Sequence, residues 1–353
     1  MKSIIVFGAT GQLGAYSVMA LRKQGKNVIA VGRRNSDNGF FQTIGVQYIG
    51  GVHLEQTNTL KDIPRTDIEA VVSMAGTMPA HADADPMTYI QSIIVGTENL
   101  CQWMQNIGAK RIVFNTTPSD VAQHFGSQQP VDENAQRDYP RDGGDHAVYT
   151  IAKRAATDLL FYYQKSKGFL PCVFRHMTVY GWHPNAYYYS NGTYKILPFR
   201  HILRCCANGM PVEVWGDPSR KKELLYIKDF AEAIVAGINS DACGIFNLPG
   251  KRPYTLEEQI DGFIHHFSPP TQRIEKIYRP EMPNTPQNLL KLGGAATELN
   301  WHPEWEWEDA CADMRKTMES DPFQILWGKA EKADIPKQYS NLLSVIKAPL
   351  IPQ

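Results

Sequence analysis

Residues 4–14 read Ile4-Ile5-Val6-Phe7-Gly8-Ala9-Thr10-Gly11-Gln12-Leu13-Gly14. The first four are apolar and mostly β-branched, a pattern typical of a buried strand in a parallel sheet. A helical pattern follows from Ala15 to Arg22, so the glycines lie between a strand and a helix N-terminus. There, glycines let the backbone approach a pyrophosphate closely, and the first N–H groups of the helix point toward it. The flanking strand and helix favour this interpretation over a tight turn without a ligand. The predicted cofactor-binding residues of the turn are Gly8, Thr10, Gly11, Gln12, Leu13 and Gly14.

The composition of the 353 residues argues against several classes of protein. Lysine plus arginine and aspartate plus glutamate each number 36, so the chain lacks the basic surplus of a nucleic-acid-binding protein. No apolar run approaches the ~18–20 residues that span a bilayer, and a first strand from about Lys2 leaves no room for a signal peptide. The six cysteines are scattered without metal-ligand spacing, which indicates reduced core residues. We therefore expect a cytoplasmic protein that binds no nucleic acid, membrane or metal.

A second apolar strand is predicted at residues 27–31, and Gly32, Arg33 and Arg34 follow it. In a dinucleotide fold the residue after the second strand meets the adenosine ribose. An acid there binds the 2′-hydroxyl of NAD, whereas an arginine accommodates the 2′-phosphate of NADP. These arginines can also be solvated loop residues, but they favour NADP as the cofactor, with NAD as the alternative.

Small residues follow the fourth predicted strand, at residues 70–74. Ala75 and Gly76 would let the backbone pass close to a cofactor. We therefore include Ala75 among the predicted cofactor-binding residues.

The fifth predicted strand, residues 111–114, leads into Asn115 and two threonines, of which Thr117 is the second. Thr117 should therefore lie at the carboxyl edge of the sheet, where ligands bind in such folds. Its hydroxyl is suited to bond a substrate oxygen and to stabilise charge that develops there. Thr116 and Ser119 compete for this role, and a threonine can also simply end a strand.

Tyr149 and Lys153 lie four residues apart in a predicted helix that ends at Gly168, so they share one helix face. A lysine ammonium beside a tyrosine favours the phenolate and lowers the tyrosine pKa from its reference value of about 10. Such a tyrosine can exchange the proton of a carbinol while a nicotinamide exchanges the hydride. Ordinary amphipathic helices also carry such pairs. The nucleotide turn and the strand end at Thr117 nevertheless favour a catalytic role for Tyr149 and Lys153.

The alternation of strand and helix loosens after Gly181. Residues 244–248 are predicted to return to the main sheet. Asp229 is predicted to cap a helix over 230–238, and Thr255 to cap the next helix, which has acids in its first turn.

These patterns predict an α/β fold, a Rossmann-like doubly wound parallel sheet with a smaller mixed C-terminal substrate domain. Residues 1–180 would form the nucleotide-binding domain, with a return segment at about 225–248. Residues 181–224 and 249–320 would form the substrate-binding part. Residues 321–353 are a C-terminal extension to which the sequence assigns no role.

The order and spacing of several motifs resemble the extended short-chain dehydrogenase/reductase superfamily. Within it, they are similar to the NAD(P)-dependent sugar-nucleotide epimerase/dehydratase family of the UDP-galactose 4-epimerase type. The matching segments are residues 8–14, 96–100, 114–117, 149–153, 174–181, 215–217, 226–229 and 298–301. The resemblance covers about residues 3–310. It implies a tightly bound NAD(P) and a homodimer formed through two long helices, here at about 86–106 and 146–167.

The resemblance also implies roles for single residues. Tyr149 would be the acid/base, Lys153 its partner and the ligand of the nicotinamide ribose, and Thr117 the hydroxyl. Lys222 stands where the family usually has an arginine for the sugar-nucleotide pyrophosphate, and Arg279 matches a second phosphate-binding arginine. A lysine is a point charge rather than a bidentate fork, and Lys222 can equally be part of a solvated basic cluster.

Some positions depart from the family pattern. Thr178, a predicted substrate-binding residue, replaces an asparagine that often contacts substrate phosphate. Ile93 stands where many members have an asparagine near the cofactor, and Gly51 where an aspartate commonly meets the adenine. The residues after Thr117 lack the Asp-Glu pair of sugar-nucleotide 4,6-dehydratases, which argues against that reaction.

The leading functional hypothesis is therefore an NAD(P)-dependent epimerase acting at a hydroxyl-bearing carbon of a nucleotide-activated sugar. Arg33 and Arg34 also fit an NADPH-dependent reductase of a sugar nucleotide, and the aromatic residues 187–189 fit a reductase of a non-sugar ketone or aldehyde. A third hypothesis is a non-catalytic NADP-sensing protein, although such relatives usually lose the pair that Tyr149 and Lys153 form here.

Overall fold

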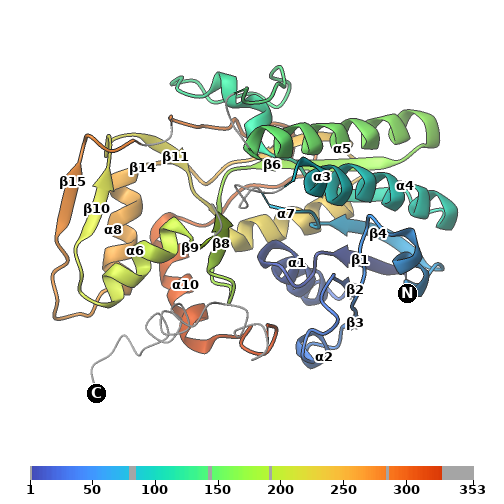
Figure 1. The fold of residues 1–353 in the computed structure, drawn as a ribbon, viewed down its shortest axis with the longest axis horizontal. Coiled ribbons are helices and arrows are strands. Elements are labelled where there is room, and N and C mark those ends of the chain that lie inside the picture. The colour runs from blue at the N-terminus through green and yellow to red at the C-terminus, as the bar shows by residue number, and fades with distance from the viewer. Residues whose placement is uncertain (1, 79–84, 142–144, 191–192, 284–285, 328–353) are drawn as a thin grey trace.

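The computed structural model describes residues 2–78, 85–141, 145–190, 193–283 and 286–327. Within these residues, seven parallel strands form the central sheet, in the order β13-β6-β5-β4-β1-β2-β3 (Figure 1). The strands are β1 (Ser3–Phe7), β2 (Asn27–Val31), β3 (Gln47–Ile49), β4 (Ile68–Ser73), β5 (Arg111–Asn115), β6 (Leu170–His176) and β13 (Gly244–Leu248). The order runs outward from β1 in both directions, which confirms the predicted doubly wound class.

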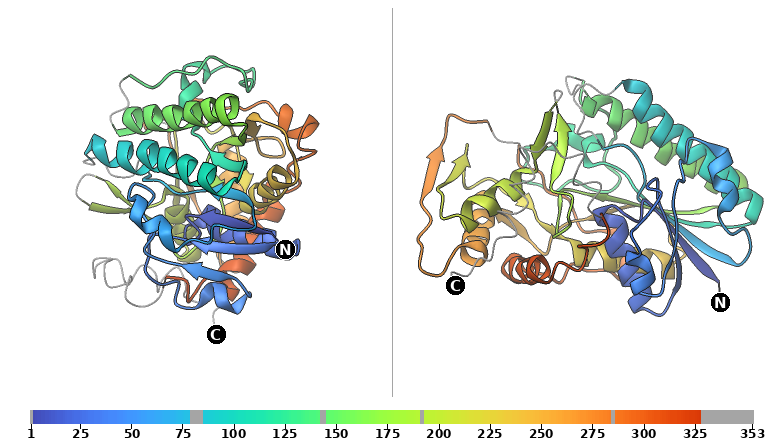
Figure 2. Two further views of the ribbon diagram at one scale, coloured as in Figure 1. Left: turned by 90° about the vertical axis from the view of Figure 1, so that its right-hand side faces the viewer. Right: turned by 60° about the horizontal axis from the view of Figure 1, so that its bottom comes forward.

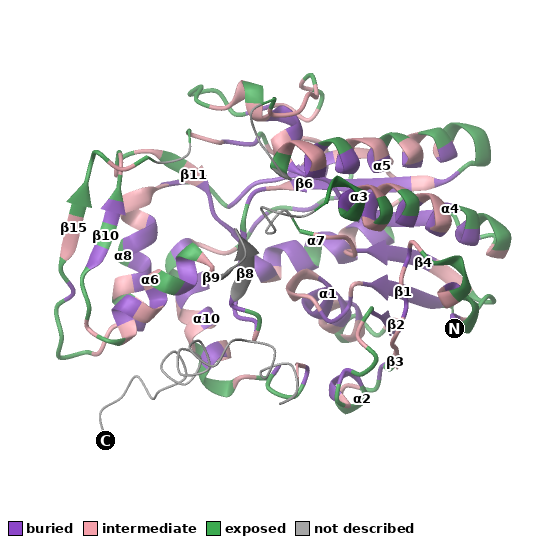
Figure 3. Ribbon diagram, in the orientation of Figure 1, coloured by how far each residue is buried: buried purple, intermediate pink, exposed green. Residues whose placement is uncertain are grey.

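The sheet is buried on both faces, as the apolar first strand predicts (Figure 3). Because successive side chains of a strand point to opposite faces, Ile4 and Val6 lie in one apolar cluster, whereas Ile5 and Phe7 lie in the other. Helices cover both faces (Figure 2). One face is covered by α1 (Gln12–Lys23) and α7 (Ile227–Asn239), the other by α4 (Gly96–Ile107) and α5 (Asp145–Lys167).

The long helix predicted at 86–106 has three parts: α3 (Pro86–Tyr89), a π-helical stretch η2 (Ile90–Val95) and α4. The apolar residues of η2 contain no proline or glycine, so the local sequence does not signal the change of hydrogen-bonding pattern. The helix expected at 146–167 is α5, as predicted.

Further elements lie beyond the carboxyl ends of the central strands, toward the left of Figure 1. The helices there are α6 (Pro198–Ala207), α8 (Leu256–Phe267) and α10 (Trp307–Ser320). Pairs of short strands accompany them: β7 (Val179–Tyr180) with β12 (Leu225–Tyr226), β8 (Tyr187–Ser190) with β9 (Thr193–Ile196), β10 (Val212–Trp215) with β15 (Lys276–Arg279), and β11 (Lys221–Glu223) with β14 (Pro253–Thr255). The remaining short elements among the described residues are α2 (Phe40–Thr43), η1 (Thr57–Asp62), η3 (Pro118–His124) and α9 (Gly294–Thr297).

Three expectations for this half of the chain have clear outcomes. β13 joins the main sheet beside β6, as predicted. Thr255 caps α8 in a capping box with Glu258, which confirms the predicted N-cap. The prediction for Asp229 is wrong: α7 begins at Ile227, and the carboxylate of Asp229 accepts N–H groups of Glu304 and Trp305 instead. No helix of the described chain is both long and apolar enough to cross a membrane.

Candidate functional site

The glycines of the turn after β1 have separate structural roles. Gly8 has φ +74°, and a β-carbon there would lie 2.8 Å from the carbonyl carbon and oxygen of Met74. A β-carbon at Gly14 would collide with the carbonyl oxygen of Gly8, so the first turn of α1 packs directly on the end of β1. Gly11 is the N-cap of α1. This division into a tight turn, a close approach and a helix–strand contact is what a dinucleotide turn requires.

The N-terminus of α1 offers donors to an anion. Its N-cap is Gly11, which has no side chain to accept from the first turn. The leading N–H groups of the helix therefore lack a capping acceptor. The amide nitrogen Nε2 of Gln12 is buried and has no hydrogen-bond partner among the residues that the structure describes. Buried donors normally have partners, so these groups fit a dinucleotide pyrophosphate and its ribose hydroxyls.

The two arginines after β2 occupy different environments. Arg33 is exposed. Arg34 is half-buried, donates to the Leu326 carbonyl at 2.6 Å, and holds its guanidinium 4.9 Å from the ring centroid of Trp327. The Tyr48 hydroxyl donates to the backbone carbonyl of Arg34 at 2.7 Å, which fixes the chain at this point. The segment after β2 is therefore held by Leu326 through the Arg34 side chain and by Tyr48 through the Arg34 backbone.

Ala75, a predicted cofactor-binding residue, lies beside the glycine turn. The Met74 N–H donates to the Phe7 carbonyl at 3.1 Å, which keeps the ends of β4 and β1 together. The Ala75 nitrogen lies 2.9 Å from the position of a β-carbon at Gly8. The strand end therefore forms one wall of the glycine turn.

Lys153 is buried at the carboxyl end of β5. Only 3% of the residue is exposed, and its ammonium donates to the Asn115 backbone carbonyl at 2.8 Å and to Asn115 Oδ1 at 3.3 Å. The ammonium also lies 4.6 Å from the ring centroid of Phe114. Burial lowers the pKa of Lys153 to about 7. These contacts join α5 to the strand end that carries Thr117.

Tyr149 lies one helical turn before Lys153, is 6% exposed, and packs edge-on against the ring of Tyr89 at 6.2 Å. Burial, and to a smaller extent Tyr89, raises the pKa of Tyr149 above its ordinary value. The sequence-based prediction of a lowered pKa is therefore wrong for the protein chain alone. Lys153 donates to Asn115, and no hydrogen bond joins it to Tyr149 in the described chain. The effect of burial therefore dominates the pKa of Tyr149.

Thr117 is 4% exposed and lies directly after β5 at the N-cap of η3, where its hydroxyl oxygen accepts the Ser119 N–H at 3.2 Å. Its competitor Thr116 is bonded elsewhere, because it accepts the hydroxyl of Thr157 on α5 at 3.3 Å. Thr117 and Lys153 thus lie at the end of β5, and Tyr149 lies one helical turn from Lys153 on α5. Within the described residues no hydrogen bond joins the Thr117 and Tyr149 hydroxyls.

The predicted substrate residues are more dispersed. Thr178 is exposed between β6 and β7. Lys222 in β11 is half-buried, with its ammonium 5.7 Å from the ring centroid of Tyr180. Arg279, at the end of β15, is exposed and its Nε lies 3.2 Å from a carboxylate oxygen of Glu213. No contact links Lys222 to Arg279 in the described part of the chain.

Two residues at this edge were not predicted from the sequence as site residues. Asn115 holds Lys153 through its backbone and its side chain. His176, at the end of β6, hydrogen-bonds the Met177 carbonyl through Nδ1 at 2.8 Å, while its buried Nε2 has no partner in the described chain. Burial lowers the pKa of His176 to about 4, so it is neutral. The position of each residue at a strand end is the only signal that the sequence offers.

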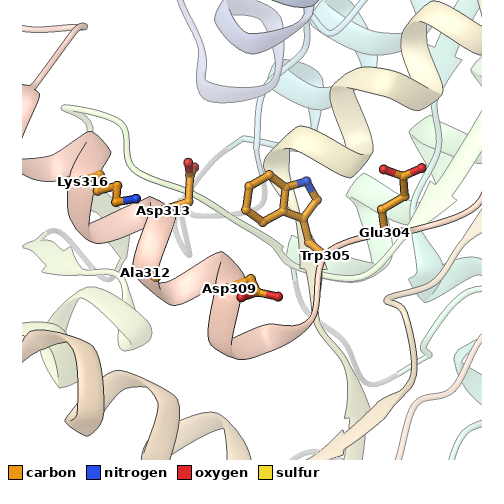
Figure 4. Close-up of a pocket in the computed structure, with 6 residues that line it drawn as sticks. All are labelled: Glu304, Trp305, Asp309, Ala312, Asp313 and Lys316. Carbon is orange, nitrogen blue, oxygen red and sulfur yellow. The ribbon is translucent and has the colours of Figure 1, made fainter.

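Two other groupings of side chains lie on α10 or against it, away from the sheet edge. A surface pocket of about 410 Å³ is lined by both acidic and basic residues (Figure 4). Its lining residues are Glu304, Trp305, Asp309, Ala312, Asp313 and Lys316. In the second grouping His265, His266 and Glu308 place their ligand atoms within 4.8 Å of one another, with both imidazoles bonded to one Glu308 oxygen. Neither grouping contains a predicted site residue.

Comparisons with known proteins identify the family of the chain and its fold. Residues 4–248 match the model of the NAD dependent epimerase/dehydratase family. A UDP-glucuronate 4-epimerase of Thermodesulfobacterium geofontis is 26% identical over 319 residues, which cover 86% of this chain and 92% of that protein. UDP-glucuronic acid decarboxylase 1 of Arabidopsis thaliana is 22% identical over 85% of this chain and 66% of that protein.

Solved structures show the same fold. The UDP-glucose 4-epimerase of Thermotoga maritima, solved with UDP-glucose, superposes with a TM-score of 0.74 at 19% identity and covers 90% of this chain and 99% of that one. The UDP-glucuronic acid 4-epimerase of Bacillus cereus, in complex with NAD, gives a TM-score of 0.68 at 18% identity, over 92% of this chain and 99% of that one. With a glycine turn built for a dinucleotide and a family match over most of its length, the chain is an enzyme that belongs to the NAD dependent epimerase/dehydratase family.

Proposed function

We propose that the protein epimerises a hydroxyl-bearing carbon of a nucleotide-activated sugar, with Tyr149, Lys153 and Thr117 as its catalytic residues. The observation that carries the proposal is the contact of Lys153, which shares a face of α5 with Tyr149, with the end of β5, where Thr117 follows. One strand, β4, separates β5 from β1, which leads into the glycine turn. The relatives that act on UDP-sugars support the substrate class.

Each catalytic residue has a defined task. Tyr149 takes the proton of the substrate hydroxyl as the carbon loses its hydride, and it returns the proton as the same carbon regains a hydride on the other face of the ketone. In its protonated form Lys153, which Asn115 holds at the end of β5, would favour the phenolate and bind the nicotinamide ribose. The Thr117 hydroxyl binds the reacting oxygen. A bound oxidised nicotinamide supplies the hydride acceptor and a positive charge that opposes the effect of burial on Tyr149.

The proposed cofactor is NADP, with NAD as the alternative. Relatives of known structure are described with NAD, whereas no acid follows β2 in this chain and Arg33 and Arg34 do. The turn residues Gly8, Thr10, Gly11, Gln12, Leu13 and Gly14 would hold the dinucleotide together with Ala75.

The substrate would lie between the sheet edge and the elements of residues 181–224 and 249–320, which we propose as the substrate-binding part. Lys222 and Arg279 would bind its phosphates, and Thr178 would contact it at the end of β6. This requires Arg279 to exchange its ion pair with Glu213 for the substrate, so Arg279 is the weaker of the two ligands in this structure.

We also propose a cytoplasmic homodimer formed through the helices at 86–107 and 145–167. Four large apolar side chains on these helices are exposed, whereas most large apolar residues of the described chain are buried. These side chains are Met87, Val95, Ile151 and Tyr162. The six cysteines are free thiols, which agrees with a reducing compartment.

The alternative is an NADPH-dependent reductase of a sugar-nucleotide ketone or of a non-sugar carbonyl compound, which Arg33 and Arg34 favour. The tyrosines at 187–189, which prompted the non-sugar alternative, have side chains outside the described part of the structure. A non-catalytic NADP sensor remains the third proposal, and the buried pair of Tyr149 and Lys153 speaks against it.

Product analysis with a panel of UDP-sugars tests the proposal. An epimerase converts a UDP-sugar to its epimer until the two reach equilibrium, with no net change in the absorbance of reduced nicotinamide. A reductase consumes one NADPH for each carbonyl reduced and leaves the panel unchanged. Dinucleotide binding without turnover of either substrate class would leave the sensor as the correct description and would overturn the proposal.

A further inference from the structure

The chain after α10 turns back onto the nucleotide-binding half of the molecule. Asp321 adopts a left-handed conformation (φ +39°) that ends α10 and redirects the backbone. Phe323 and Leu326 are then fully buried. The ring of Phe323 packs against Tyr16 of α1 at 5.0 Å and Phe40 of α2 at 5.6 Å. Residues 321–327, which we call the C-terminal strap, are therefore a packed part of this half.

The strap reaches the carboxyl edge of the sheet at the glycine turn and the end of β2, where the adenosine of a dinucleotide would lie. We call this the adenosine end of the cofactor edge. The indole N–H of Trp327 donates to the backbone carbonyl of Thr10, in the glycine turn, at 3.1 Å. Arg34 donates to the Leu326 carbonyl at 2.6 Å, and its guanidinium lies over the Trp327 ring at 4.9 Å. These contacts join the glycine turn, the end of β2 and the strap.

The residue after the second strand is the one that meets the ribose and any 2′-phosphate in this fold. An arginine side chain loses much rotamer freedom when it binds a ligand, and that loss weakens binding unless the side chain is already fixed. A guanidinium has five N–H donors in a planar fork that matches phosphate geometry, and the bond to Leu326 engages Nη1. The exposed Arg33 has no such contact with the strap in the described structure.

We propose that the strap sets the preference for NADP over NAD, with Trp327 as a positioning residue that fixes Arg34 and Thr10 around the 2′-phosphate. This inference rests on the NADP preference in the proposed function, and gives a role to the part of the C-terminal extension that the structure describes. The contact pairs two residues 292 positions apart, Arg34 and Leu326, so no local motif encodes it.

The test measures dissociation constants of NADPH and NADH for the full-length protein and for Trp327→Ala, Trp327→Phe and Trp305→Ala. Adenosine 2′,5′-bisphosphate and AMP serve as probes that lack the nicotinamide and report on the adenosine end alone. Trp305 is the matched control, because it also lies against a cation, with the Lys228 ammonium 5.2 Å from its ring, but has no contact with the glycine turn in the described chain.

We expect Trp327→Ala to weaken the binding of NADPH and of adenosine 2′,5′-bisphosphate by about tenfold, as the loss of one oriented charge-assisted contact implies. NADH and AMP should change less than twofold. Trp327→Phe keeps a ring beside Arg34 but removes the bond to Thr10, so it should give an intermediate loss. Trp305→Ala should leave the ratio of NADPH to NADH affinity unchanged.

Other outcomes separate this inference from the proposed function. If the native protein prefers NADPH and Trp327→Ala weakens all four ligands equally, or none, the strap does not select the cofactor and the inference is wrong while the proposed function stands. If the native protein prefers NADH, the NADP assignment fails and the inference fails with it. If no dinucleotide binds, the proposed function itself is wrong. Thermal unfolding of each variant confirms that the compared proteins are folded.

Discussion

The proposed cofactor site has a reaction end, beside Lys153 at the end of β5, and an adenosine end, beside Arg34 beyond β2. The two ends are held in place in different ways. At the reaction end, Lys153 is buried and held by Asn115, from a strand directly beside its helix. At the adenosine end, Arg34 lies half-buried at the surface and is held by the strap, which follows α10. At the first end, burial disfavours the charged form of Lys153, and the core of the sheet fixes its position. The second is held by a peripheral segment, so we expect changes in the strap to alter the proposed cofactor preference without altering the proposed reaction site.

Removal of the Tyr149 hydroxyl should have the largest effect and should be confined to the reaction end. We expect Tyr149→Phe to lower kcat by about 10²- to 10⁴-fold, the usual contribution of a positioned acid/base, and to leave the dissociation constant of the cofactor unchanged. Tyr162→Phe is the control, because Tyr162 lies on the same helix and is 60% exposed. Steady-state kinetics of a substrate found in the UDP-sugar panel provides the measurement. Retention of kcat in Tyr149→Phe would remove Tyr149 from the mechanism.

A β-carbon at Gly8 in the glycine turn should lower both the stability of the protein and its affinity for the cofactor. Gly8 and Gly108 both have φ +74°, but a β-carbon at Gly8 would press on Met74 whereas one at Gly108 would meet no atom within 4 Å. Gly108→Ala should therefore cost about 1 kcal/mol of the free energy of unfolding, for the backbone strain alone. Gly8→Ala should cost about 1–3 kcal/mol more of the free energy of unfolding, for overpacking. It should also weaken binding of the cofactor. Equal losses in urea unfolding would show that the turn tolerates a side chain.

The buried ammonium of Lys153 should make stability depend on pH. Burial lowers its pKa from 10.5 to about 7 in the folded protein. Between these values the unfolded chain binds a proton that the folded chain lacks, so the free energy of unfolding rises with pH. From pH 7 to 8.5 the wild-type protein should gain up to about 2 kcal/mol relative to Lys153→Met. Urea unfolding without nucleotide measures the difference, and parallel profiles would mean that Lys153 titrates normally.

The sequence predicts the parts of the edge that depend on local pattern. The strand, turn and helix of residues 4–22 follow from an apolar run and glycine spacing, and the shared face of Tyr149 and Lys153 follows from the helical period. Thr255 is likewise predictable, because its capping partner Glu258 is three residues away. In each case the contact is made by neighbours along the chain.

The sequence does not predict contacts that the tertiary fold creates. Lys153 meets Asn115 from 38 positions away, and Asp229 bonds the backbone of Glu304 rather than its own helix. The pKa of Tyr149 is misjudged for the same reason, since the extent of burial is a property of the packed sheet and helices. The role of the strap at Arg34 depends on the fold in the same way.

The smallest expected effect is a control for the comparison of the two ends. The Thr255 hydroxyl accepts the Glu258 N–H at 3.0 Å, and the Glu258 carboxylate accepts the Thr255 N–H at 2.7 Å. Thr255→Ala should lower the free energy of unfolding by about 1 kcal/mol, as loss of an N-cap does. The NADPH and NADH affinities should keep their ratio, because α8 contacts neither the glycine turn nor the strap through a hydrogen bond in the described residues. If this ratio shifted as far as in Trp327→Ala, a general loss of stability would suffice to change cofactor preference. The adenosine end could then not be assigned to the strap.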